Sequence, residues 1–269
     1  MTLELESASY EAGGRMLVHG LRIAVVPGRV TVLAGPNGAG KSTALRLMSG
    51  DLRPAAGRVR LNDRSLGQWS AGEQALQRAV MMQHTRLDFP FPAADVVAMG
   101  RAAHRGSNRT ANARIVRRAL RLADATVLSE RLYTTLSGGE RQRVQFARAL
   151  AQIIEPVPQG WSRFLLLDEP TASLDIAHQG TIMTVARALA TEGIGVLAVL
   201  HDLNLAATFA DELVLMQRGK IVAAGHPREV LKAGTIAAVY GTEVRVEHHA
   251  ELDRVVILPL GPTRPHSPG

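Results

Sequence analysis

The sequence contains no cysteine, few aromatic side chains and no long apolar run. Without cysteine, disulfide bonds and thiolate metal sites are excluded, and a reducing compartment is permitted. Aromatic residues make up only 4% of the 269 residues, although the hydrophobic share of 46% is enough for a real core. The longest apolar stretches, such as 194–200, fall far short of the roughly 20 residues that a membrane-spanning helix needs. Residues 1–6 are acidic and alternating, unlike a signal peptide. We therefore expect a soluble, cytoplasmic protein that would reach a membrane only by docking onto a protein that spans it.

Acidic residues are also fewer than basic ones, at 24 against 31, which gives a formal charge of +7. A basic balance favours phosphates, nucleic acid or a membrane surface, and ordinary surface charge around a nucleotide site explains it equally well. Many arginines gather in one segment: Arg101, Arg105, Arg109, Arg114, Arg117, Arg118 and Arg121. No aromatic residues interleave with them, so the pattern favours a solvated helix face over a nucleic-acid interface.

A glycine-rich stretch lies between the apolar run 30–34, typical of a buried strand, and the helical pattern 43–48. It fits G-x-x-x-x-G-K-[ST], the phosphate-binding P-loop. The residues expected to bind nucleotide are Gly35, Pro36, Asn37, Gly38, Ala39, Gly40, Lys41, Ser42 and Thr43. Glycines let successive N–H groups point at phosphate oxygens, and the helix N-terminus adds roughly half a positive charge. Lys41 can reach the phosphates and Ser42 can offer its hydroxyl to Mg²⁺, so the pattern predicts a nucleoside triphosphate site.

Polar side chains end three of the apolar runs. Asp168 and Glu169 follow the run 164–167, where Asp168 is placed to hold Mg²⁺ through water and Glu169 to orient or deprotonate an attacking water. His201 ends the next run on the same expected edge and can hydrogen-bond the γ-phosphate. Gln83 ends another and can touch the metal or the water. The expected catalytic residues are thus Glu169, His201 and Gln83, and the expected metal site is formed by Ser42, Gln83 and Asp168.

A pair of glycines opens the helical pattern 138–154. Ser137 and Glu140 around them fit the S-x-x-E capping box. However, Gly138 and Gly139 each cost a helix about 1 kcal/mol, which makes sense if the backbone approaches a ligand closely. This predicts a second phosphate-facing helix N-terminus. Because the P-loop already serves the chain's own nucleotide, we expect a dimer with ATP at its interface.

Together these residues resemble the ATP-binding subunits of ABC transporters. Gly35–Ser42 is similar to the Walker A motif, 164–169 to Walker B, and 136–140 to the signature motif, with glutamate at its last position where glutamine is commoner. The resemblance implies that Asp175 belongs to the D-loop, and it identifies Gln83 and His201 with the Q-loop and the switch histidine.

Tyr10, which we place in a loop between the first two strands, either stacks on a base or covers a hydrophobic edge. The resemblance favours stacking on adenine.

The resemblance also implies an α/β fold, a P-loop NTPase of the ABC ATPase type. It has a RecA-like core sheet, an N-terminal antiparallel β-subdomain and an inserted α-helical subdomain at about 86–146. We expect the ATPase domain to span 1–240. A C-terminal strand extension would follow at 241–258, with a disordered tail at 259–269.

Finer features are similar to the heme (hemin) importer ATPases, within the branch that serves ferric-siderophore, heme and cobalamin uptake. They are the segment Asp95–Arg101 with His104, and the stretches 167–179 and 196–207. This likeness implies a homodimer, a transmembrane permease dimer, a periplasmic substrate-binding protein and a place at the cytoplasmic face of the inner membrane.

Cargo is expected to pass through the permease without touching this chain. His248 and His249 could be taken for heme ligands. However, adjacent residues on a strand point to opposite faces, so we expect both at the surface. Ferric siderophores and cobalamin remain rival cargoes. A soluble ABC-type ATPase acting on nucleic acid or ribosomes is the alternative from another class. The single P-loop and the lack of a heptad run count against it, and copurification would separate the two.

Overall fold

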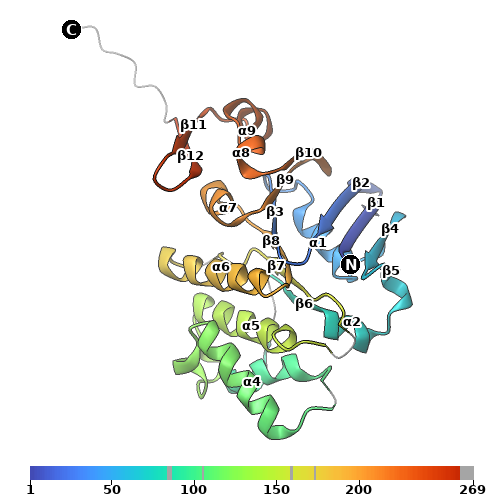
Figure 1. Cartoon of the computed structure of the whole chain (residues 1–269), viewed down its shortest axis with the longest axis vertical. Coiled ribbons are helices and arrows are strands. Elements are labelled where there is room, and N and C mark those ends of the chain that lie inside the picture. The colour runs from blue at the N-terminus through green and yellow to red at the C-terminus, as the bar shows by residue number, and fades with distance from the viewer. Residues whose placement is uncertain (84–86, 105, 158–159, 173, 261–269) are drawn as a thin grey trace, which may run out of the picture.

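The computed structural model describes residues 1–83, 87–104, 106–157, 160–172 and 174–260. Its centre is a six-stranded sheet in the order β10-β9-β3-β8-β7-β6, shown in Figure 1. The strands are β3 (Val30–Ala34), β6 (Arg78–Met81), β7 (Phe164–Asp168), β8 (Gly195–Val199), β9 (Glu212–Gln217) and β10 (Lys220–Gly225). All neighbours are parallel except β10, which returns antiparallel to β9 through a tight turn.

The central strands are buried on both faces because helices or a second sheet cover each side. Along β7, Phe164 and Leu166 point into one core, and Leu165 and Leu167 point into the other. The all-apolar sequence of β7 follows from this arrangement, since neither face meets water. The prediction of a strand covered on both sides is confirmed.

One of the two cores lies between the central sheet and an antiparallel sheet in the order β2-β1-β4-β5. Its strands are β1 (Leu3–Ala12), β2 (Arg15–Val25), β4 (Ala56–Leu61) and β5 (Arg64–Ser65). Helix α1 (Lys41–Met48) is packed between the sheets through Leu45, Leu47 and Met48, which are fully buried. Burying each such side chain contributes about 2 kcal/mol. This core therefore fixes the helix whose N-terminus carries the P-loop, and the expected N-terminal β-subdomain is confirmed.

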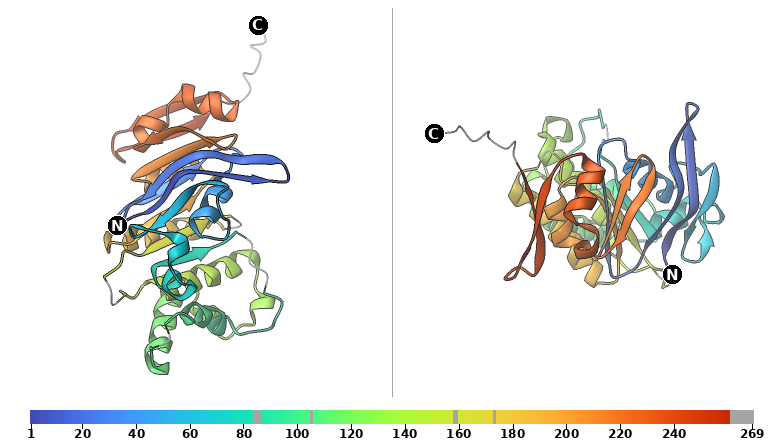
Figure 2. Two further views of the ribbon diagram at one scale, coloured as in Figure 1. Left: turned by 90° about the vertical axis from the view of Figure 1, so that its right-hand side faces the viewer. Right: turned by 90° about the horizontal axis from the view of Figure 1, so that it is seen from above.

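A helical insert forms the end of the molecule opposite the C-terminal strands (Figures 1 and 2). It contains α3 (Ala93–Ala98), α4 (Arg109–Leu122) and the start of α5 (Gly138–Ile153), with short 3-10 turns at Met99–Arg101, Thr126–Leu128 and Tyr133–Thr135. In α4, Ile115, Val116, Ala119 and Leu120 are buried. Its arginines at 109, 114, 117, 118 and 121 are exposed, which confirms the solvated face for these five, and Arg105 lies outside the described residues.

Arg101 is the exception to the solvated arginine face, because only 5% of it is exposed. Its guanidinium donates to the Ala151 carbonyl at 2.8 Å and to Asn112 at 3.0 Å, and it pairs with Glu155. A buried charge is tolerated when its donors are satisfied in this way. Arg101 therefore joins the insert to the end of α5, and counting it with the exposed arginines was wrong.

The remaining elements complete the layers around the central sheet (Figure 2). They are α2 (Ala71–Gln77) with a 3-10 turn at Leu66–Gln68, α6 (Ile176–Thr191), α7 (Leu203–Phe209), α8 (Pro227–Val230), α9 (Ala233–Tyr240), β11 (Val244–His249) and β12 (Arg254–Pro259). The hairpin β11–β12 packs on α7, where the Asn204 side chain bonds both the N–H and the C=O of Ile257, at 2.8 and 3.1 Å. Of the described residues, none belongs to a helix that is both long and apolar enough to cross a membrane.

The boundaries at 1–240 and 241–258 stay a proposal, as does the tail. Strand β12 runs to Pro259, and 261–269 lie outside the described residues. The ring of Trp161 meets that of Trp69 edge-on at a centroid distance of 4.8 Å. This contact packs Trp161 against the core beside the antiparallel sheet.

Candidate active site

The P-loop curls around the N-terminus of α1 and forms a hollow of about 310 Å³. Its lining is Leu17, Asn37, Gly38, Ala39, Gly40, Lys41, Ser42, Thr43 and Glu169. Two glycines make the curl possible. Gly35 has φ +145°, and a Cβ there would lie 2.1 Å from the Met216 carbonyl oxygen. Gly40, with φ +99°, caps the helix where a Cβ would lie 2.8 Å from Val18. A side chain at either position would force the loop away from its neighbours.

Lys41 lies under the loop and is 5% exposed. Its ammonium donates to the carbonyls of Gly35 and Pro36 at 2.8 and 3.0 Å. Burial lowers the pKa of Lys41, and the nearby carboxylates of Glu169 and Asp168 oppose that shift. The loop therefore holds a positive charge at the helix N-terminus, where anions are favoured.

Asp168 ends β7 beside the P-loop, and its carboxylate accepts a hydrogen bond from the Ser42 hydroxyl at 3.0 Å. Burial raises the pKa of Asp168, while the Ser42 hydrogen bond opposes the shift. A hydroxyl and a carboxylate are hard oxygen donors, and Mg²⁺ takes one or two of these together with phosphates and waters. The donors thus fit Mg²⁺ when a triphosphate supplies the rest. Among the described residues, no group of three or more His, Asp or Glu side chains forms a separate metal site.

The structure brings all three expected catalytic residues together. The Glu169 carboxylate contacts His201 Nε2 through one oxygen, at 2.5 Å, and accepts from Gln83 Nε2 through the other. Gln142, on α5, donates to the Glu169 backbone carbonyl at 2.9 Å and was not anticipated from the sequence. Glu169 also has φ +50°, a left-handed conformation that costs a non-glycine residue about 1 kcal/mol or more. The surrounding contacts hold this residue in a strained position beside the P-loop hollow.

A second hollow, of about 390 Å³, opens at the N-terminus of α5. It is lined by Ser137, Gly138, Gly139, Glu140, Arg143, Leu174, Asp175 and His178. The predicted capping box is confirmed, with Ser137 N–H donating to Glu140 at 2.8 Å and Glu140 N–H donating to the Ser137 hydroxyl at 3.3 Å. The Ser137 N–H lowers the pKa of Glu140. Asp175 therefore lies beside this glycine pair, whereas Glu169 lines the other hollow.

Tyr10 is not in a loop. Strand β1 continues through register shifts to Ala12, and the turn falls on Gly13 and Gly14, so Tyr10 pairs with Val18 inside the sheet. Leu17, next to Val18, lines the P-loop hollow instead.

Tyr240, which the sequence did not single out, lies behind the P-loop. Burial raises its pKa to about 12, and the Gly35 N–H opposes that shift.

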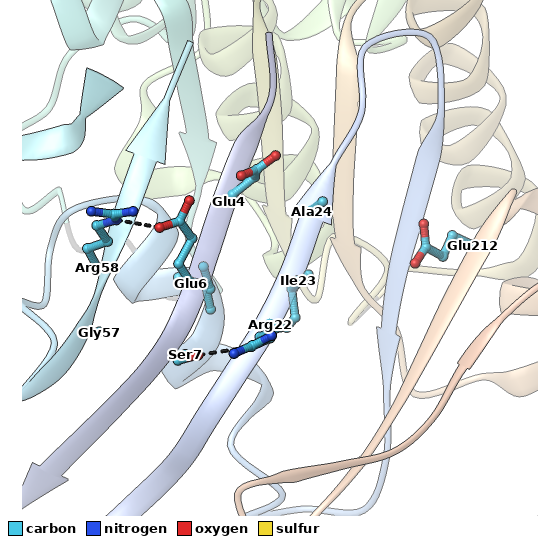
Figure 3. A pocket seen from close by; sticks show the side chains of 10 residues that line it. Glu4, Glu6, Ser7, Arg22, Ile23, Ala24, Gly57, Arg58 and Glu212 are labelled. Carbon is cyan, nitrogen blue, oxygen red and sulfur yellow. Dashed lines mark hydrogen bonds and ion pairs between the residues drawn. The ribbon is translucent and has the colours of Figure 1, made fainter. Parts of the chain in front are cut away.

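Neither the larger groove along β1 and β2 nor the adjacent histidines on β11 have the features of a nucleotide site. A groove of about 860 Å³ runs along β1 and β2 (Figure 3), but it carries no glycine-rich loop. Some of its charged side chains are paired, as Arg58 is with Glu6. His248 and His249 are both exposed on β11, as expected. The P-loop hollow is therefore the candidate for nucleotide binding.

Comparison with known proteins agrees with this geometry. The family model described as ABC transporter matches residues 18–172. The hemin import ATP-binding protein HmuV of Rhizobium meliloti (strain 1021) is 45% identical over 255 residues, which cover 95% of this chain and 97% of the relative. The HmuV protein of Gloeobacter violaceus is 46% identical, with coverages of 95% and 93%.

Solved structures share the fold. An inward-facing conformation of an ABC transporter assigned to the metal-chelate type superposes with a TM-score of 0.77 at 25% identity, over 97% of this chain and 98% of that one. A dimeric ATP-binding cassette bound to ADP and phosphate superposes with a TM-score of 0.73 at 24% identity, over 84% of this chain and 99% of that one.

Proposed function

This chain belongs to the ABC transporter family, and from that premise we propose that it is the ATP-hydrolysing subunit that powers import of hemin through a membrane permease. Family membership makes it an ATP hydrolase coupled to transport. Hemin as cargo is supported by relatives that cover nearly the whole chain and are named for hemin import. The observation that carries the mechanism is the convergence of the P-loop, Asp168 and Glu169 at one edge of the central sheet.

In the proposed site, the P-loop N–H groups and Lys41 bind the phosphates of ATP. Ser42 and Asp168 hold Mg²⁺, with Gln83 close to the metal or to the attacking water. When bound, Mg²⁺ neutralises charge that develops on the phosphates. Tyr10 stacks on the adenine. Its strand partner is Val18, and the neighbouring residue Leu17 lines the hollow.

Glu169 orients the attacking water and accepts its proton. Its two carboxylate oxygens contact different residues, Gln83 and His201, and each oxygen keeps a second lone pair that can accept a hydrogen bond from the water. His201, at the end of β8, is placed to hydrogen-bond the γ-phosphate once it leaves the carboxylate.

The second hollow would complete the ATP site of a partner subunit. The motif Ser137–Glu140 presents a helix N-terminus, and Asp175 lies beside it. In a head-to-tail homodimer, each ATP would contact the P-loop of one subunit and this hollow of the other. The fold similarity to a dimeric cassette is compatible with that arrangement.

The permease is the proposed membrane anchor, at the cytoplasmic face of the inner membrane, with a periplasmic substrate-binding protein in the full complex. Phe89 and Phe91, which follow Gln83 in the chain, support a docking surface there. They are 68% and 40% exposed, with ring centroids 6.2 Å apart. Exposed aromatic pairs of this kind commonly mark interaction sites. Hemin would contact the permease and not this chain.

Replacing Glu169 tests the catalytic assignment. The substitution Glu169→Gln keeps the size of the side chain and its contacts but removes the base, so ATP binding should persist while turnover falls by about a hundredfold or more. Lys41→Ala should instead weaken ATP binding, because it removes the buried cation. Calorimetric ATP binding and steady-state phosphate release measure both. Near-normal hydrolysis by Glu169→Gln would refute its role.

Cargo is tested in vesicles that contain the partner permease and binding protein. Hemin, cobalamin and a ferric siderophore are supplied in turn with ATP inside the vesicle lumen that faces this subunit. Hemin uptake that the Glu169→Gln variant abolishes is the expected result. Selective uptake of a ferric siderophore would favour the rival that the metal-chelate assignment of one structural neighbour suggests.

A further inference from the structure

His178 occupies the first turn of α6, where it faces two carboxylates that belong to different parts of the molecule. Its Nδ1 lies 2.7 Å from the Asp175 carboxylate, which also accepts the His178 backbone N–H at 2.9 Å. Its Nε2 lies 3.6 Å from the Asp124 carboxylate. Asp175 caps α6 after the central strand β7, whereas Asp124 follows α4 in the helical insert. The imidazole therefore bridges the sheet domain and the insert.

Arg143 extends this bridge to the signature helix α5. Its guanidinium donates to the Asp124 carbonyl at 2.6 Å and to the Asp124 carboxylate at 3.1 Å. Arg143, Asp175 and His178 all line the hollow at Ser137–Glu140. The chain of contacts from Asp175 through His178 and Asp124 to Arg143 thus runs along the surface that would face the partner's ATP.

From these contacts we propose that His178 is a positioning residue, which locks Asp175 to the helical insert so that Asp175 and Ser137–Glu140 approach the partner subunit as one surface. The inference rests on the proposed ATP-bound dimer. A mobile helical insert would otherwise present the two elements independently, and binding would have to order both. Prior alignment lowers that ordering cost in each of the two symmetric interfaces.

Both ring nitrogens of His178 face carboxylates. One belongs to Asp175 in its own helix cap, and the other to Asp124 in the insert, with Arg143 behind Asp124. The ring therefore contacts both parts of the molecule at once.

The test measures ATP-driven dimerisation in the Glu169→Gln background, where ATP is retained. Analytical ultracentrifugation across an ATP titration gives the half-point, the ATP concentration at which half of the protein is dimeric. Adding His178→Gln should raise this concentration about three- to fivefold, because partly exposed pairs are individually weak but occur twice per dimer.

Two controls isolate the bridge. His249→Gln removes an exposed histidine on β11 and should leave the half-point unchanged. Asp124→Asn should also raise the half-point, and the double variant should raise it by less than the sum of the two, since both variants break the shared contact between His178 and Asp124. Monomeric ATP affinity, measured by calorimetry, should stay constant throughout and shows that each variant folds.

An unchanged half-point in His178→Gln would overturn the positioning role. Failure of the Glu169→Gln parent itself to dimerise with ATP would instead refute the proposed dimer, and this inference with it. The two failures are distinguishable because only the second appears in the parent protein.

Discussion

Gly35→Ala is the substitution whose cost can be worked out most directly from the structure. The change adds one methyl group at the start of the P-loop. That carbon would lie 2.1 Å from the Met216 carbonyl oxygen and 3.3 Å from the Ala39 side chain. The first separation is more than 1 Å shorter than ordinary contact, and its partner is strand backbone, which cannot rotate away. The loop must therefore move from β9.

The backbone of Gly35 adds a second penalty. Its φ of +145° is nearly closed to residues with a side chain, and such conformations cost about 1–3 kcal/mol. Gly38 provides a matched control in the same loop, because its φ is +75° and nothing lies within 4 Å of an added Cβ. Gly38→Ala should cost only the conformational part, about 1 kcal/mol. Gly35→Ala should exceed about 3 kcal/mol, since the clash adds to the strain.

Thermal unfolding without nucleotide separates the two costs from any loss of ATP contacts. At roughly 2 °C per kcal/mol for a chain of this size, Gly35→Ala should lower Tm by about 6 °C or more and Gly38→Ala by about 2 °C. Calorimetry should then show lost ATP affinity in Gly35→Ala. Equal shifts in Tm for the two variants would refute the argument that the β9 backbone fixes the loop.

Two further substitutions test contacts away from the phosphates. Asn204→Leu removes both hydrogen bonds to Ile257 and should lower the free energy of unfolding by about 2 kcal/mol, with faster proteolysis of the β11–β12 hairpin than in the wild type. Asp211→Asn tests a pH effect: although burial alone would raise the pKa of Asp211, hydrogen bonds from Arg187 and from the Val30 N–H lower it below the usual value. Because the folded pKa is depressed, this stabilisation is present above about pH 4 and is lost as pH falls through the folded pKa, so the Tm gap between wild type and Asp211→Asn should narrow in acid.

The parts of the fold that the sequence predicted are those with local signals. The strand β7 follows from its unbroken apolar run, and the start of α5 follows from the Ser137 and Glu140 capping pair. The P-loop follows from its G-x-x-x-x-G-K-[ST] spacing. In each case the sequence signal lies within a few positions, so the element could be predicted without knowledge of distant contacts.

The predictions that failed, and the features that were missed, depend on contacts between distant segments. Tyr10 belongs to β1 because the strand continues through irregular pairings that composition does not reveal. Arg101 looks like its neighbours in sequence, and its burial depends on a carbonyl from α5 and on the Glu155 carboxylate just after that helix, 50 or more residues away. Gln142 carries no motif, and His178 lies in the stretch 167–179 that resembles the heme importer ATPases but was given no role there. A weak signal existed for His178, which stands three residues after a capping aspartate.

Helix α5 has a place in both half-sites of this chain, and that follows from two residues close together in sequence. Its N-terminus forms the hollow at Ser137–Glu140, and Gln142, just beyond it, holds the backbone carbonyl of Glu169. Glu169 sits in a strained conformation that its neighbours must maintain. Any rotation of α5 against the central sheet therefore stretches or breaks a contact that keeps Glu169 beside the P-loop. In the proposed dimer, ATP of the partner subunit that contacts the α5 N-terminus would act on Glu169, the proposed catalytic base, through less than two turns of helix.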